Sequence, residues 1–323
     1  MTNVLLVTSW NTPNHCGIEE HSQYLQESVQ AADPTIKVRC AAEALDPDWV
    51  RYVSRLEDFP ILHLNFHRAL HSRWTPDAVK KFQAWGYKVV ITFHDTYGEH
   101  EPDDLSKALH DLADAFIVHE PCIGLEKAIY WRMGVPELDA RVGEWSPYYL
   151  TRPILGTMGH DFGWKSWSRV CAIAKEAGWG MLICCPEMSI EREAELRAHN
   201  PWLEVRRGRE RQQLLADLSA CDATAFLFVC GNSGQSASIL QGIGARKPVI
   251  AFSTCRQMRA LYADEYGRHA IRWAETFEEV PLALRYMPLQ RFDTPTVALA
   301  AQDSWTLQGQ RYATLYQQLL EAR

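Results

Sequence analysis

Short runs of apolar, β-branched residues recur along the first half of the chain, with helical patterns between them. The runs begin at Val4 (VLLVTS), Phe59 (FPILHLN), Tyr87 (YKVVITF) and Asp114 (DAFIVH). Runs of this length bounded by turn residues are typical of parallel strands buried on both faces. The helical patterns cover residues 19–30, 76–85 and 104–112. This alternation predicts a doubly wound α/β sheet.

A second series of the same kind follows an interruption. Residues 141–153 contain two prolines and several aromatic side chains and break the rhythm. The later apolar runs begin at Pro153 (PILGTM), Gly180 (GMLICC), Leu203 (LEVRRG), Ala223 (ATAFLFVC) and Lys247 (KPVIAF). Each half therefore predicts a Rossmann-like unit. We expect domains at residues 1–150 and 151–303 and a last helix at residues 304–323.

Composition narrows the classes of protein. Of the 323 residues, 47% are hydrophobic and 23% are charged, which is the usual balance of a globular protein. The net charge of -7 provides no general field for a polyanion, so nucleic acid is not favoured as a partner. The chain has no signal-peptide pattern and no apolar run of about 18 residues, so we expect a cytoplasmic protein. Its nine cysteines are scattered and predict reduced thiols.

Two loops in the first half carry candidate chemistry, because ligands of open parallel sheets bind beyond the carboxyl ends of the strands. In NTPNHCGIEEHS, Gly17 lets the backbone approach an anion where the next helix begins. The alternative is a simple tight turn. In FHDTYGEH, His94 and Asp95 stand at a strand end, where an imidazole can form a hydrogen bond or exchange a proton. A turn and helix cap is the alternative.

Two loops in the second half predict phosphate binding. LGTMGHDFGWKSWSRV presents Lys165 near a helix start, which suits a diphosphate. Its glycines are not spaced as GxGxxG and it lacks GK[ST], which argues against dehydrogenases and P-loop NTPases. The segment 231–236 (GNSGQS) forms a strand-to-helix junction with exposed amides, an anion cradle whose alternative is a flexible connection ending in an N-cap serine.

Other polar and aromatic residues are weaker indications of a functional site. The histidines at positions 63, 67, 71 and 100 lack metal-ligand spacing, so we expect no metal site. The short run of arginines at positions 206, 207, 209 and 211 is flanked by Glu204 and Glu210 and predicts a solvated loop or helix start. Among the 12 tryptophans, Trp10, Trp164 and Trp167 are candidates to line a binding site.

The order of these motifs resembles glycosyltransferase family 4 and its GT-B relatives over nearly the full chain. Six stretches carry the resemblance: HCGIEEHSQYL, VVITFHD, LGTMGHDFGWK, LLADLSACDATAF, ILQGIGARKPVIA and DSWTLQGQRYATLYQQLL. The third matches the family's G-[RK]-x4-K loop, with Gly159 and Lys165 in register. The last resembles a terminal helix that returns to the first domain. The resemblance implies two Rossmann-like domains whose parallel sheets face a central cleft.

The resemblance also implies residue roles. His94 would contact the donor sugar near the reaction centre, and Lys165 would hold the diphosphate and stabilise the leaving group. The donor-binding residues would be Cys16, Gly17, Gly159, His160, Lys165, Ser233, Gly234, Gln235, Ser236 and Gln241. Candidates on the acceptor side are Trp10, His15, Glu19 and Asp95. The implied reaction moves a sugar from a nucleoside diphosphate sugar to a hydroxyl acceptor. It proceeds with retention of anomeric configuration and without a metal or resident cofactor.

The chain departs from the family pattern at two places. His160 stands where the family has an arginine, and Ser233 and Gln241 stand where it has paired glutamates. A non-catalytic GT-B subunit that binds a nucleotide or a partner is therefore an alternative. A nucleotide-sugar epimerase and a transferase acting on modified bases in DNA are others, although a saccharide, lipid-linked glycan or small molecule is favoured as acceptor.

Overall fold

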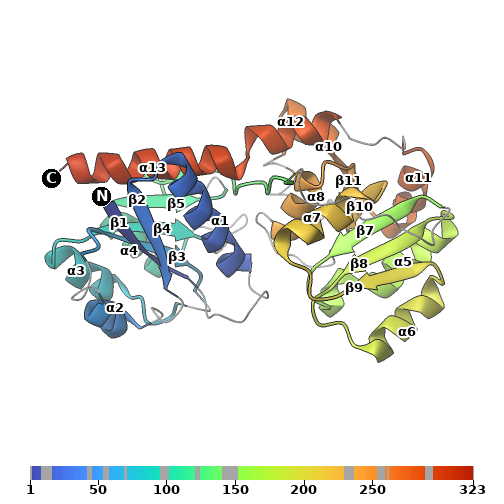
Figure 1. Ribbon diagram of the computed structural model, residues 1–323, viewed down its shortest axis with the longest axis horizontal. Helices are drawn as coiled ribbons and strands as arrows, with labels where there is room; N and C mark the ends of the chain where they lie inside the picture. Colours follow the sequence, from blue (N-terminus) through green and yellow to red (C-terminus); the bar gives the residue numbers. More distant parts are fainter. Residues whose placement is uncertain are drawn as a thin grey trace. The chain divides into compact units, whose positions relative to one another are not determined.

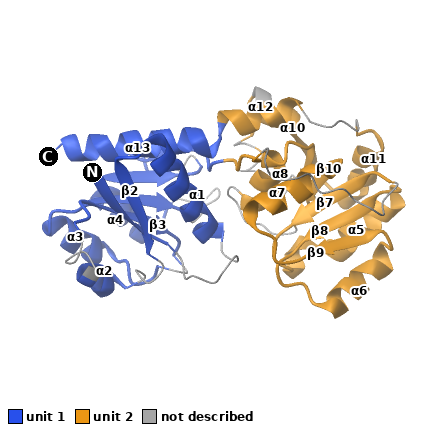
Figure 2. Ribbon diagram, in the orientation of Figure 1, with its two compact units in different colours: residues 1–134, 303–323 blue, residues 135–302 orange. Residues whose placement is uncertain are grey.

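The computed structural model divides the chain into two compact units, coloured separately in Figure 2. Unit 1 comprises Met1–Gly134 and Asp303–Arg323, and unit 2 comprises Val135–Gln302. The structure describes residues 2–8, 17–41, 46–53, 58–68, 71–94, 102–120, 124–139, 152–228, 236–252, 259, 262–287 and 294–322. The domain boundary expected at residue 150 falls outside these ranges.

Unit 1 is built on one six-stranded parallel sheet (Figure 1). Its strands are β1 (Thr2–Val7), β2 (Ile36–Ala41), β3 (Ile61–Phe66), β4 (Lys88–Phe93), β5 (Ala115–Val118) and β6 (Ile129–Tyr130). Its helices are α1 (Gly17–Ala32), α2 (Pro47–Val53), α3 (Pro76–Ala84), α4 (Asp104–Leu112) and α13 (Trp305–Glu321). The strand order is β2-β1-β3-β4-β5-β6, and each pairing is parallel.

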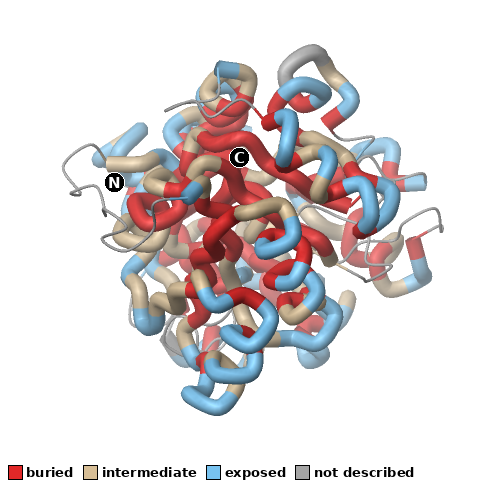
Figure 3. Tube along the Cα trace, turned by 90° about the vertical axis from the view of Figure 1, so that its right-hand side faces the viewer, coloured by how far each residue is buried: buried red, intermediate tan, exposed pale blue. Residues whose placement is uncertain are grey.

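The sheet of unit 1 is covered on both faces because successive side chains of a strand point to opposite sides. On one face, Leu64 packs in a core with Val79 of α3. On the other, Leu6 packs in a core with Leu25 of α1 and Tyr312 of α13. Unit 1 therefore has three layers. Figure 3 shows the buried segments of the chain in red.

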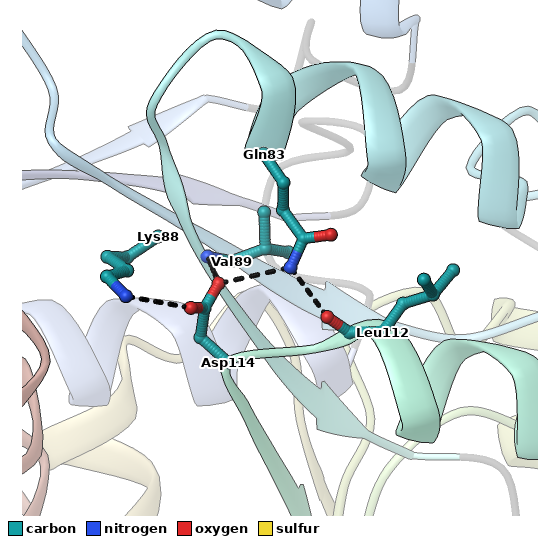
Figure 4. A network of polar contacts seen from close by, with 5 residues as sticks. All are labelled: Gln83, Lys88, Val89, Leu112 and Asp114. Carbon is teal, nitrogen blue, oxygen red and sulfur yellow. Dashed lines mark hydrogen bonds and ion pairs between the residues drawn. The ribbon is translucent and has the colours of Figure 1, made fainter.

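A partly exposed polar anchor joins β4, β5 and α3. The carboxylate of Asp114, directly before β5, accepts hydrogen bonds from the backbone nitrogen of Val89 (2.9 Å), Lys88 Nζ (3.1 Å) and Gln83 Nε2 (3.2 Å) (Figure 4). Gln83 Nε2 also donates to the carbonyl oxygen of Leu112 (2.6 Å). These contacts tie the beginnings of the two strands together, so their carboxyl ends finish at the same edge of the sheet.

Helix α13 lies directly against α1. At their contact, a Cβ atom on Gly309 would stand 2.3 Å from the carbonyl oxygen of Ser28. No side chain fits such a separation, so the close approach of the helices requires glycine at position 309.

A buried hydrogen-bond network also fastens α13 to the sheet. His63 of β3 bonds through Nδ1 to the hydroxyl of Tyr316 (2.6 Å) and through Nε2 to Thr92 Oγ1 (2.8 Å). Thr92 Oγ1 in turn bonds to the hydroxyl of Tyr312 (3.0 Å). Both nitrogens of His63 are thus satisfied, which a fully buried imidazole requires.

Unit 2 repeats this architecture around its own six-stranded parallel sheet, in the order β12-β11-β10-β7-β8-β9. Its strands are β7 (Ile154–Met158), β8 (Gly180–Cys184), β9 (Leu203–Arg206), β10 (Ala223–Phe226), β11 (Val249–Phe252) and β12 (Ile271–Ala274). Its helices are η2 (Gly163–Lys165), α5 (Trp167–Glu176), α6 (Ile190–His199), α7 (Arg211–Ser219), α8 (Ala237–Gly244), α10 (Glu265–Ala270), η3 (Phe277–Glu279), α11 (Val280–Arg285) and α12 (Thr294–Gln302). One core lies against α5 and α6, and a second against α7.

The predicted fold class, two Rossmann-like units with parallel sheets, is confirmed. The sequence patterns missed β2, β6 and β12, and all three are edge strands. An edge strand is less apolar than a central one: β2 exposes Lys37 and Arg39, charges that protect an open edge against further pairing. The five described cysteines are free thiols, and four are buried. None of the described helices is long and apolar enough to cross a bilayer.

We expect Tyr316→Phe to lower the free energy of unfolding by about 1–3 kcal/mol, because it leaves the buried Nδ1 of His63 without its partner. Urea-induced unfolding measures the loss. Tyr286→Phe is the matched control, since Tyr286 is 74% exposed and its replacement should change little. Equal unfolding midpoints for the two variants would contradict the role of the network.

Candidate functional site

Four polar side chains meet at the carboxyl-end edge of the unit 1 sheet. Asn65 lies near the end of β3, His94 directly follows β4, and His119 directly follows β5. His21 joins them from α1. The ring centroids are 4.7 Å apart for His21 and His94, 5.0 Å for His94 and His119, and 5.3 Å for His21 and His119. We call these four residues the histidine cluster.

The buried side-chain amide of Asn65 connects the cluster to α1. Its Nδ2, which has two hydrogens to donate, lies 2.6 Å from Ser22 Oγ, 3.1 Å from His21 Nδ1 and 3.2 Å from the carbonyl oxygen of Ile18. Its Oδ1 accepts a hydrogen bond from Nε2 of His94. One amide thus sets the positions of two imidazole rings.

Burial keeps the three imidazoles neutral. Desolvation, followed by the other histidines nearby, holds the pKa of His94 well below the ordinary 6.5. The same causes lower the pKa of His21, and burial lowers the pKa of His119 to about 4. A neutral imidazole has one nitrogen lone pair, so it can accept a hydrogen bond or a proton.

The three rings also form a candidate metal site, which the sequence did not predict. One ring nitrogen from each of His21, His94 and His119 lies within 4.8 Å of the others. A tetrahedral Zn²⁺ with Zn–N distances of about 2.0–2.1 Å needs nitrogens about 3.4 Å apart. In addition, Nδ1 of His21 faces Nδ2 of Asn65 at 3.1 Å, so this ring nitrogen points at the amide rather than at open space. Two lone pairs, rather than three, are therefore open to a ligand.

Lys165 is the main feature of unit 2. It ends η2, in the loop after β7, and is only 4% exposed. Its Nζ donates to the carbonyl oxygen of Met158 (3.0 Å) and lies 5.5–5.6 Å from the ring centroids of Trp164, Trp167 and Phe228. Burial lowers the pKa of this amine to about 8. Lys165 is thus an ammonium group that apolar surroundings have largely desolvated.

Gly159 lets the backbone pass against Lys165. It has a φ of 115°, and a Cβ atom there would stand 1.9 Å from Lys165 Nζ and 3.4 Å from Ser238 Oγ in the first turn of α8. The loop after β7, the amine and the start of α8 therefore come together within unit 2. Beside them, His160 donates through Nδ1 to the carboxylate of Glu187 (2.5 Å).

The remaining predicted residues fall into two groups. Gly17 begins α1 and is exposed, Glu19 is buried on α1, Ser236 precedes α8, and Gln241 is 2% exposed within α8. Seven others lie outside the described part of the chain: Trp10, His15, Cys16, Asp95, Ser233, Gly234 and Gln235.

The sequence patterns did not single out His21, Asn65 or His119. His119 follows the apolar run of β5 just as His94 follows that of β4, so the signal that identified His94 applies to it equally. Asn65 is an amide inside an otherwise apolar strand, and a buried amide needs hydrogen-bond partners. Only the packing of α1 on the sheet identifies His21.

The GT-B fold is the class that this architecture defines, and comparison with solved structures supports it. AviGT4, a glycosyltransferase involved in avilamycin A biosynthesis, matches with a TM-score of 0.65 and 14% identity over 100% of this chain and 99% of that one. HepE (Alr3699) of Anabaena, in complex with UDP and glucose, gives 0.66 and 12% over 100% of both chains. MurG of Acinetobacter baumannii gives 0.59 and 13% over 98% of this chain and 100% of its own. No protein-family model and no curated protein sequence matches.

We expect Gly159→Ala to displace Lys165, because the added methyl group would overlap Nζ. The pKa of the amine should then rise from about 8 toward the ordinary 10.5, as followed by NMR titration of labelled lysine. Gly178→Ala is the matched control: its φ of 80° gives similar backbone strain, but nothing lies within 4 Å of the added Cβ. If both variants leave the titration of Lys165 unchanged, the contact is not what keeps the amine buried.

Proposed function

We propose that this protein is a glycosyltransferase that moves a sugar from a nucleoside diphosphate sugar to a hydroxyl acceptor. The GT-B fold and the resemblance to glycosyltransferase family 4 support this proposal, as does HepE, whose complex holds UDP and glucose. In this scheme the reaction proceeds in the cytoplasm, with retention of configuration and without a metal on the diphosphate. The acceptor is a saccharide, lipid-linked glycan or small molecule.

The buried amine of Lys165 is the observation that carries the proposal. Among the described residues, no carboxylate lies within ion-pair distance of its Nζ. Asp161 and Glu187 raise the pKa of the amine from a distance but do not pair with it directly, so a bound anion would be a direct counter-charge for it. A diphosphate supplies that charge, and it needs most stabilisation when it departs as the leaving group. Gly159 and the start of α8 would bring backbone groups to the same anion.

His94 takes the second role in this proposal. It stands at a strand end, where ligands of parallel sheets bind, and is partly accessible while its two neighbouring histidines are buried. Its neutral ring can accept a hydrogen bond from a hydroxyl of the donor sugar. The sugar would be held at the reaction centre by this contact.

A second candidate is a non-catalytic GT-B subunit that binds a nucleotide without turnover. Gln241 favours it, because this residue replaces a family glutamate and is buried within α8. Both candidates bind a nucleotide, and only the transferase releases nucleoside diphosphate from a nucleotide sugar. The assay of nucleoside diphosphate release given below separates them.

We expect one family of nucleoside diphosphates to stabilise the protein against heating, by about 2.7 kcal/mol at 100 times the dissociation constant. Lys165→Met should weaken this binding about tenfold or more, because it removes a charge-assisted hydrogen bond. Lys175→Met, at an exposed site on α5, is the control. No stabilisation by any diphosphate would exclude both candidates.

Binding should also depend on pH through Lys165. Because burial lowers the pKa of the free amine to about 8, the ammonium form is present below this pH and is lost above it. A bound diphosphate raises the pKa, so binding takes up a proton and weakens as the pH rises above 8. In Lys165→Met, the affinity should be low and independent of pH over this range.

With the donor that this screen identifies, His94→Ala should lower kcat by about tenfold and change KM less, since the lost hydrogen bond positions the sugar for transfer. Release of nucleoside diphosphate provides the assay. The exposed His199 of α6 supplies the control variant, His199→Ala. A His94→Ala variant with unchanged kcat would remove this histidine from the reaction.

A further inference from the structure

The hydrogen-bond partners of Asn65 determine which atoms of its side chain are donors. One end of the side chain lies 3.2 Å from the carbonyl oxygen of Ile18, which can only accept a hydrogen bond. The nitrogen Nδ2 must therefore be at that end, and Oδ1 must face His94. Since Oδ1 only accepts, Nε2 of His94 carries a hydrogen. In the neutral ring, Nδ1 is then the lone pair.

The same reasoning fixes the proton of His119. Its Nδ1 lies 2.9 Å from the carbonyl oxygen of Trp131, so Nδ1 donates and Nε2 has the lone pair. Nε2 of His119 is buried and has no hydrogen-bond partner among the described residues. A buried lone pair without a donor is costly, so it indicates a ligand that donates.

We propose that Asn65 is a positioning residue that holds His94 in its Nε2–H tautomer, so that His94 and His119 present hydrogen-bond acceptors to a bound hydroxyl group. The identity of that ligand as the sugar of the donor rests on the proposed function. The assignment of the His94 tautomer does not depend on the proposed function.

This arrangement selects the chemistry of the ligand. Two acceptor nitrogens bind groups that donate, such as the neighbouring hydroxyls of a neutral sugar. A carboxylate or phosphate has no hydrogen to offer and would face two lone pairs. The histidine cluster therefore favours uncharged, hydroxylated groups, whereas Lys165 favours an anion.

Asn65 is itself held firmly, which lets one amide control the ring. Ser22, which accepts from its Nδ2, bonds further to Thr8 Oγ1 (2.7 Å) and to the carbonyl oxygen of Ile18 (2.8 Å). Among the described residues, the ionisable groups that lower the pKa of His94 are four histidines: His21 from α1, His119 after β5, and His67 and His71 after β3. Each of them disfavours a charged His94, so the neutral tautomer is maintained.

NMR of the full-length protein labelled with ¹⁵N in histidine tests the proposal without any donor or acceptor. Two-bond correlations between ring nitrogens and carbon-bound hydrogens distinguish the tautomers, and a His94→Gln variant assigns the signals of His94 among the 12 histidines. We expect His94 to be a single Nε2–H tautomer at neutral pH. A predominant Nδ1–H tautomer would overturn the proposal.

Two substitutions test the part played by Asn65. Asn65→Leu should release the ring, so that the Nδ1–H tautomer becomes visible. Asn65→Asp keeps the shape but adds a negative charge, which should raise the titration midpoint of His94 by about 1 pH unit or more. If the leucine variant does not fold, the aspartate variant alone decides the question.

Asn200→Asp is the matched control, because Asn200 is a fully buried amide of unit 2 that donates to the carbonyl oxygen of Trp179 (3.2 Å). It should lower stability without changing the His94 signals. Unchanged His94 signals in both Asn65 variants would show that another group sets the tautomer. Because no substrate enters these spectra, that result would leave the glycosyltransferase assignment untouched.

Discussion

The parallel pairing of the strands is the constraint on which both candidate sites depend. In a parallel sheet all strands end at the same edge, so residues far apart in the chain become neighbours there. In unit 1 this brings together Asn65, His94 and His119, which follow or end three adjacent strands. In unit 2 it places the loops after β7 and β10 beside each other, and Lys165 lies between aromatic rings from both.

Desolvation gives the two edges opposite chemical characters. In unit 1, buried imidazoles lose their charge and keep their lone pairs. In unit 2, a buried amine remains cationic near neutral pH, although burial has brought its pKa down to about 8. A sugar joined to a diphosphate contains both complementary groups, because its hydroxyls donate hydrogen bonds and its phosphates carry negative charge. Under the proposed function, each edge by itself would match one part of such a donor.

Most of the fold could be predicted from the sequence, because buried central strands appear as continuous apolar runs. The missed strands were β2, β6 and β12, which lie at sheet edges. Strands at an exposed edge mix polar and apolar residues, so they do not appear as continuous apolar runs. His94 and Lys165 could be identified from their positions after strands. His21 and Asn65 could not, because their role depends on a hydrogen bond between α1 and β3 that no local pattern encodes.

Helix α13 belongs to unit 1 but is synthesised last, which affects how unit 1 folds during synthesis. The chain leaves unit 1 after Gly134, builds all of unit 2, and returns at Asp303. During synthesis, the apolar face of the first sheet that α13 covers stays open until unit 2 has emerged from the ribosome. The hydrogen bond between His63 and Tyr316 cannot form before that point either. Unit 2 is continuous, so it can complete its core before α13 closes unit 1.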